Sequence, residues 1–186
     1  SNLAWMYFTQ GLFEKAEPLY RRALDVFARA LGPDHPDLAI TLNNLGALYY
    51  KQGRYAAALP VFRRSLEIKE RALPVDHPDL APALNNLAML YRAQGRHAEA
   101  GPLLEQALRI REKSLGPAHP ELARSLFNLG RLYREEGRAK EARPLLERAL
   151  AMLEQGATAS PVLLADVRRE IATLAPDSGR KKVKSE

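Results

Sequence analysis

Histidine is the residue type with the clearest metal chemistry in this chain, because it recurs at a fixed interval. His35, His77 and His119 each precede a proline, and successive members are 42 residues apart. A zinc site would bring imidazole nitrogens to about 2.1 Å from one ion. Equivalent positions in a helical repeat are two helices apart, and neighbouring helices pack at about 8–10 Å. We therefore predict no metal site, and expect each histidine to bond its loop or cap the next helix.

The sequence contains no motif that would support catalysis. A nucleophile elbow, a phosphate loop, an HExxH pair and a dinucleotide fingerprint are all absent. The carboxylates are scattered, often beside Arg or Lys. The chain has no cysteine, which excludes disulfides, thiol chemistry and cysteine-based zinc sites. We predict no catalytic residue, no cofactor and no small-molecule substrate.

The histidines belong to an internal repeat, and a repeat decides the fold before any other feature. A connector motif occurs as LGPDHP at 31–36, LPVDHP at 73–78 and LGPAHP at 115–120. A longer motif occurs as LNNLGALYYKQGRY at 42–55, LNNLAMLYRAQGRH at 84–97 and LFNLGRLYREEGRA at 126–139. One glycine per repeat keeps the same 42-residue interval: Gly11, Gly53, Gly95 and Gly137. The chain is therefore an array of similar units.

Within one repeat the apolar residues have helical spacing. Leu42, Leu45, Leu48 and Tyr49 form one stripe, and Gly53 follows as a left-handed residue past the helix end. A second stripe runs over residues 58–73, so each repeat is predicted to be two helices joined by a tight turn. Prolines recur inside the second helix, at Pro18, Pro60, Pro102 and Pro144. Because an internal proline removes a helical hydrogen bond, we expect it near the first turns or at a bend.

One repeat resembles the tetratricopeptide repeat (TPR) signature. The matching residues are Leu42-x-x-Leu45-Gly46-x-x-Tyr49, followed by Ala58-x-x-x-Phe62. A 42-residue period with the LGPxHP connector is similar to the TPRs of kinesin light chains and their bacterial relatives. The resemblance covers roughly residues 1–155, and Leu42 stands where tryptophan is commonest. It implies an all-α fold, a right-handed α-solenoid of TPR helical hairpins.

The expected organisation is a single TPR array over residues 1–175. It consists of a truncated repeat 1 at 1–31, repeats 2 to 4 at 36–73, 78–115 and 120–155, and a C-terminal capping helix at 160–175. Repeat proteins need such a cap for solubility. Residues 176–186 are predicted to be a disordered basic tail.

In TPR arrays the first helices line a concave surface, and the resemblance places the binding residues there. By register, the predicted peptide-binding groove consists of Asn43, Asn44, Ala47, Tyr50, Asn85, Asn86, Met89, Arg92, Arg124, Phe127, Asn128, Arg131 and Arg134. An asparagine amide both donates and accepts, so it can bond any peptide backbone. Arginines select carboxylates through forked hydrogen bonds, and Tyr50, Met89 and Phe127 offer apolar anchors. The alternative is that the asparagines bond neighbouring helices and only stabilise the stack.

Composition limits the partners further. The net charge of +6 is spread thinly apart from the tail, so a nucleic-acid surface is not expected. No apolar run approaches the roughly 20 residues that a membrane span needs. The first residues do not form a signal peptide, and a lack of cysteine fits a reducing cytoplasm, where we expect the protein to be located.

The leading hypothesis is an adaptor that binds an acidic, partly apolar peptide segment of another protein. A second hypothesis is a sensor or regulatory segment of a larger signalling protein such as a STAND-type ATPase, because the truncated first helix leaves a core face that needs a neighbour. The third is a homo-oligomer that assembles through the same N-terminal end, at Leu3, Tyr7 and Leu12.

Overall fold

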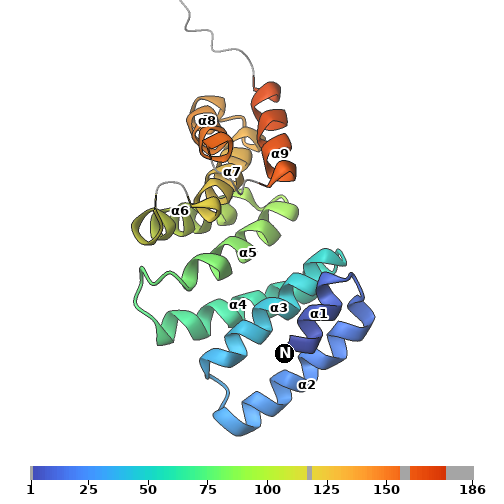
Figure 1. Ribbon diagram of the computed structural model, residues 1–186. Helices are drawn as coiled ribbons and strands as arrows, with labels where there is room; N and C mark the ends of the chain where they lie inside the picture. The colour runs from blue at the N-terminus through green and yellow to red at the C-terminus, as the bar shows by residue number, and fades with distance from the viewer. Residues whose placement is uncertain (1, 117–118, 156–159, 175–186) are drawn as a thin grey trace, which may run out of the picture. The chain divides into compact units, whose positions relative to one another are not determined.

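The computed structural model describes residues 2–116, 119–155 and 160–174, and these residues form only helices and turns. The helices are α1 (Asn2–Thr9), α2 (Phe13–Leu31), α3 (Pro36–Lys51), α4 (Tyr55–Ala72), α5 (Leu80–Ala93), α6 (His97–Ser114), α7 (Pro120–Glu135), α8 (Ala139–Gln155) and α9 (Pro161–Thr173) (Figure 1). The all-α class is confirmed. The predicted tail at 176–186 lies outside the described residues, and the repeat boundaries stay a prediction. No described helix is both long and apolar enough to cross a bilayer.

The turn inside each hairpin depends on a glycine in the left-handed region. Gly53 has a φ of 71°, and the backbone N–H of Arg54 bonds the carbonyl of Tyr49 at 2.9 Å, which closes the end of α3. The Arg54 guanidinium lies 4.4 Å from the centre of the Tyr49 ring. Gly11, Gly95 and Gly137 also have positive φ angles. The predicted helical hairpin with a glycine turn is therefore confirmed.

The recurring histidines bond backbone N–H groups at or just before the start of the next helix. His35 and His119 cap α3 and α7, whereas His77 bonds Asp79 in the turn before α5. In His35, His77 and His119, the Nδ1 atom accepts a hydrogen bond from the backbone N–H two residues later, at 3.2 Å in each case. This bond satisfies one of the free N–H groups at a helix start. Pro36 and Pro120 occupy the first turns of α3 and α7, where a proline loses no helical bond. The prediction that each histidine bonds its loop or caps the next helix is confirmed.

The internal prolines lie early in their helices. Pro60 is in the second turn of α4, which begins at Tyr55, and the helix continues to Ala72. Pro18, Pro102 and Pro144 take the same place in α2, α6 and α8. The prediction that Pro60 lies near the first turns is confirmed, and the helix accommodates it without ending.

The chain divides into two compact units, residues 1–110 and residues 111–186. In the first unit, α1 pairs with α2 and α3 with α4, while α2 also packs on α3 and α4 on α5. In the second unit, α7 pairs with α8, and α9 packs on both of them. Each second helix in these contacts covers the first helix of the hairpin that follows it.

The predicted apolar stripe forms the core of the first unit. Leu45 is 3% exposed, Leu48 is 0% exposed and Tyr49 is 3% exposed. Gly46, on the same face, lets α3 approach α4 so closely that the Phe62 ring fills the place of a side chain. The equivalent Gly130 in α7 faces Leu146 of α8 in the second unit. Small residues at this register therefore set the spacing within a hairpin.

A charged network joins the first hairpin to the second. Glu17 of α2 accepts hydrogen bonds from Arg54 at 2.7 Å, from Arg21 at 3.0 Å and from the Tyr49 hydroxyl at 3.0 Å. Burial raises the pKa of Glu17, but these three donors together lower it below its ordinary value of 4.5. Arg21 also donates to the Tyr49 hydroxyl at 2.9 Å. The carboxylate thus fixes α2 against the end of α3.

Candidate peptide-binding face

Every residue predicted for the groove lies on α3, α5 or α7, the first helices of their hairpins. In the first unit these residues are Asn43, Asn44, Ala47 and Tyr50 on α3, and Asn85, Asn86, Met89 and Arg92 on α5. In the second unit they are Arg124, Phe127, Asn128, Arg131 and Arg134 on α7. Because α3 contacts α5, the structure brings the first set together. We call this set, with the equivalent side of α1, the first-helix face.

The asparagines of the first-helix face divide into two kinds. The Asn86 amide donates to the Asn43 side-chain oxygen at 3.0 Å, and both side chains belong to half-buried residues. This bond ties α5 to α3, so the stacking role holds for that pair. Asn44 is also half-buried, and its side-chain amide forms no hydrogen bond within the part of the chain that the structure describes. Asn44 is therefore the amide on α3 that a peptide backbone could bond.

Aromatic rings extend the first-helix face onto α1. The Tyr50 ring lies 5.6 Å from the Tyr55 ring, and the equivalent Phe8 ring lies 5.9 Å from Phe13. Trp5, which is 47% exposed, lies 5.3 Å from Phe8. Sequence reasoning did not select Trp5 and Phe8, although they stand 42 residues before Ala47 and Tyr50. Aromatic rings at this spacing form a surface on which apolar side chains can pack.

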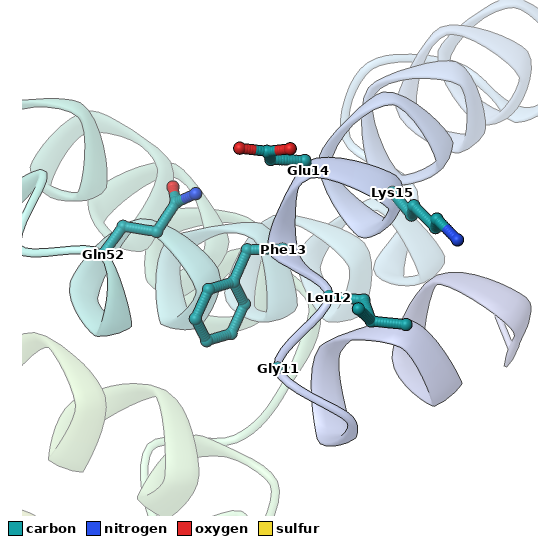
Figure 2. A pocket seen from close by; sticks show the side chains of 6 residues that line it. All are labelled: Gly11, Leu12, Phe13, Glu14, Lys15 and Gln52. Atoms are coloured by element: carbon teal, nitrogen blue, oxygen red, sulfur yellow. The ribbon is translucent and has the colours of Figure 1, made fainter.

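A hollow lies at the end of this aromatic row. It has a volume of about 260 Å³ and is lined by Gly11, Leu12, Phe13, Glu14, Lys15 and Gln52. Figure 2 shows the Phe13 ring between the Gly11 turn and the Gln52 side chain, while Lys15 extends away from Gln52. The hollow therefore joins the α1–α2 turn to the end of α3, next to the rings of the first-helix face.

The second unit carries the arginines. Phe127 and Asn128 are each 7% exposed, so both are buried. Arg124 is exposed and lies 3.4 Å from Glu121 on its own helix. Arg131 and Arg134 both form ion pairs with Glu170 of α9. Their side chains are 37% and 29% exposed, so the pair is reachable from solvent but already has a carboxylate between its members.

The described residues contain no group of three His, Cys, Asp or Glu side chains that could hold a metal ion. His35, His77 and His119 are each engaged at a separate helix start. The side chains of the first-helix face can bond a backbone, pack on an apolar group and pair with a carboxylate.

The family model described as tetratricopeptide repeat matches residues 1–71 and 79–155. The chain belongs to the TPR family. A search of curated proteins found no match. The TPR fold implies a scaffold for protein–protein interaction, and TPR proteins are generally non-enzymatic scaffolds.

Solved structures place this TPR chain among repeats of the kinesin-light-chain type. The TPR-like repeats of a kinesin-light-chain protein from Podosopora anserina share 28% identity at a TM-score of 0.77, over 92% of this chain and 81% of that one. A variant form of those repeats gives 27% identity and a TM-score of 0.78 over the same shares. BtubC (BKLC) from P. vanneervenii shares 28% identity at a TM-score of 0.81, over 92% of this chain and 68% of that one. The TPR solenoid class inferred from the repeats is confirmed.

Proposed function

We propose that this TPR array is an adaptor that binds an acidic, partly apolar peptide segment of another protein on its first-helix face. The main support is the recurrence of half-buried polar and apolar residues at the same registers of α3 and α5. Residues of intermediate exposure in rigid helices lose little conformational freedom on binding, so they suit recognition. The alternation of amide and apolar groups suits a ligand peptide that has an extended backbone and one anchoring side chain.

The apolar part of the ligand would pack on the rings and on Met89. Tyr50 is stacked against Tyr55, which fixes its orientation before a ligand arrives. Met89 on α5 is half-buried and stands at the register of Ala47 and Trp5. A flexible thioether beside rigid rings adapts to several apolar side chains. Tyrosine and methionine are common at the centres of protein interfaces.

The acidic preference is supported by an arginine of the first helices. On the first-helix face, Arg92 follows Met89 by one turn of α5. A guanidinium bonds a carboxylate with two parallel N–H donors, which gives direction as well as charge. The net charge of +6 favours an acidic partner at long range.

Selection from a random peptide library against the full chain tests the proposal. We expect the selected peptides to be enriched in acidic and apolar residues, and their affinity to fall as salt rises. The variant with Tyr50→Ala and Met89→Ala should bind them at least about tenfold more weakly, which is the loss expected from one interface anchor. Arg22→Ala, at an exposed site on the second helix α2, is the matched control. Equal affinity for the face variant and the control would exclude this binding face.

Self-assembly is the second candidate, favoured by the apolar end of α1. Leu3 and Met6 are 52% and 55% exposed, whereas the equivalent Leu45 and Leu48 are 3% and 0% exposed. We expect light scattering to show a mass that increases with concentration, and the Leu3→Lys, Met6→Lys variant to remain monomeric. A strict monomer at high concentration would exclude self-assembly.

A further inference from the structure

Helix α9 takes the position of a further first helix. It begins at Pro161 after the cap Ser160, whose hydroxyl accepts from the N–H of Leu163 at 3.4 Å, and it packs on α7 and α8 as α5 packs on α3 and α4. Glu170 stands 42 residues after Asn128, and so at the register of Asn44 and Asn86. The asparagine row of the first helices therefore ends in a carboxylate.

The contacts of Glu170 differ from those of Asn86, an earlier member of the row. Asn86 bonds Asn43 on the neighbouring first helix, but the residue equivalent to Asn43 in α7 is Phe127, which has no polar side-chain atom. Glu170 instead lies between two arginines of α7. Its Oε1 atom is 3.2 Å from the Nε of Arg131, and its Oε2 atom pairs with the Nε of Arg134.

The carboxylate in this ion-pair cluster is largely shielded from water. The Glu170 side chain is 12% exposed, and Glu135 is a second carboxylate beside Arg131 at 3.2 Å. A shielded carboxylate attracts neighbouring guanidinium groups more strongly than one on an open surface. The Arg131–Arg134 pair is therefore a formed carboxylate site, and the resident carboxylate shows which ligand chemistry it accepts.

The rest of α9 packs on α7 and α8. Val167 is the buried residue of this helix, and Arg168 adds an exposed ion pair to Glu154 at 2.8 Å. A helix of 13 residues is marginal without packing. The Glu170 ion pairs add to the packing on α7 and α8 that keeps α9 docked.

We propose that Glu170 is a built-in competitor, so that an acidic partner segment binds the Arg131–Arg134 pair only by taking the place of this carboxylate. The proposal rests on the proposed function and adds a regulatory step to it. The first-helix face of the first unit is open to a ligand, whereas the arginine site of the second unit opens when Glu170 leaves. An acidic ligand and a docked α9 therefore oppose each other.

Replacing the carboxylate in the full chain tests the competition. The probe is an acetylated, amidated Glu-Leu-Glu-Glu peptide, titrated into ¹⁵N-labelled protein while the Nε–Hε signals of Arg131 and Arg134 are followed by NMR. We expect Glu170→Gln to bind the probe at least about tenfold more tightly than the parent chain, within the usual range of coupling between two ligands. Glu147→Gln, which removes a carboxylate from an ion pair within α8 of the same unit, should bind as the parent does.

Two further measurements separate competition from other causes. Adding Arg131→Ala and Arg134→Ala to Glu170→Gln should abolish the gain in affinity, and amide exchange should show that α9 opens more often in Glu170→Gln. Equal probe affinity for the parent and Glu170→Gln would overturn the proposal, and so would a gain that survives loss of both arginines. Either result leaves the library test on Tyr50 and Met89 intact, so the two proposals can fail separately.

Discussion

Gly46 and Phe62 meet where α3 approaches α4, and a Cβ atom on Gly46 would lie 2.6 Å from two atoms of the Phe62 ring. Phe62 is 2% exposed, so its ring has little space to move. We expect Gly46→Ala to lower the free energy of unfolding by about 1–3 kcal/mol, the usual cost of overpacking a core. The loss should appear although alanine is the better helix former by about 1 kcal/mol. Urea unfolding measures it.

The next repeat supplies the control for this prediction. Ala88 and Leu104 stand 42 residues after Gly46 and Phe62. In that repeat the larger alanine replaces glycine, and the smaller leucine replaces phenylalanine. Phe62→Leu alone should destabilise the protein by leaving empty volume. In the Gly46→Ala background the same change should restore part of the lost stability. Additive effects in this double-mutant cycle would contradict the steric explanation.

Tyr20 is a buried tyrosine whose hydroxyl finds no hydrogen-bond partner among the described residues. An unsatisfied buried hydroxyl costs about 1–3 kcal/mol, and the equivalent residues in the later repeats are Phe62, Leu104 and Leu146. We therefore expect Tyr20→Phe to leave thermal stability unchanged or to raise it. A clear loss of stability in Tyr20→Phe would show that the hydroxyl has a stabilising contact.

The pH dependence of the same variant gives an independent check. Burial raises the pKa of Tyr20 to about 12, above its ordinary value of 10. The folded state therefore keeps a proton that the unfolded state loses, so this residue weakens folding as pH rises from 10 towards 12. The stability advantage of Tyr20→Phe should increase across that interval.

Glu17 should make the protein sensitive to acid. Its pKa is lowered in the folded state, so its contribution is complete above the ordinary value of 4.5 and is lost as pH falls through the folded value. At pH 7 we expect Glu17→Gln to cost about 1.5–3 kcal/mol, the range for hydrogen bonds to a charged group. This difference should shrink below pH 4.5 in urea unfolding. Glu14→Gln, at an exposed site on the same helix, should show no such change.

Local patterns predicted most of the fold from sequence. Gly53 requires a left-handed turn and His35 precedes a proline at a helix start, so each feature depends on neighbouring residues alone. The two rings Trp5 and Phe8 were missed, although the 42-residue interval places them at the register of Ala47 and Tyr50.

The sequence did not predict the pairing of Glu170 with Arg131 and Arg134, for a different reason. The 42-residue interval from Asn128 marks the position, but the helix around Glu170 lacks the repeat motif. Whether a carboxylate there meets Arg131 and Arg134 depends on how α9 packs on α7, which the sequence period does not specify. The sequence therefore predicted that the arginines bind a ligand carboxylate, but it did not predict their pairing with Glu170.

Among the charged side chains of the second unit that have a named partner, that of Arg111 is the most buried. Its side chain is 7% exposed, and it donates to the Ser125 hydroxyl at 2.5 Å and to Glu121 at 2.9 Å. We expect Arg111→Met to lower the free energy of unfolding by about 2 kcal/mol. This is less than the about 3–5 kcal/mol for a fully buried pair, because Glu121 is 37% exposed and can be hydrated.

Two variants show whether burial is the cause. Arg124→Ala removes a guanidinium that also faces Glu121 but is 56% exposed, so its cost should be below about 1 kcal/mol. Arg111→Met leaves the Ser125 hydroxyl without a partner, and Ser125 is 1% exposed. Adding Ser125→Ala removes this hydroxyl and should recover part of the lost free energy of unfolding. If Arg111→Met and Arg124→Ala cost the same, the ion pair rather than its buried setting determines the contribution.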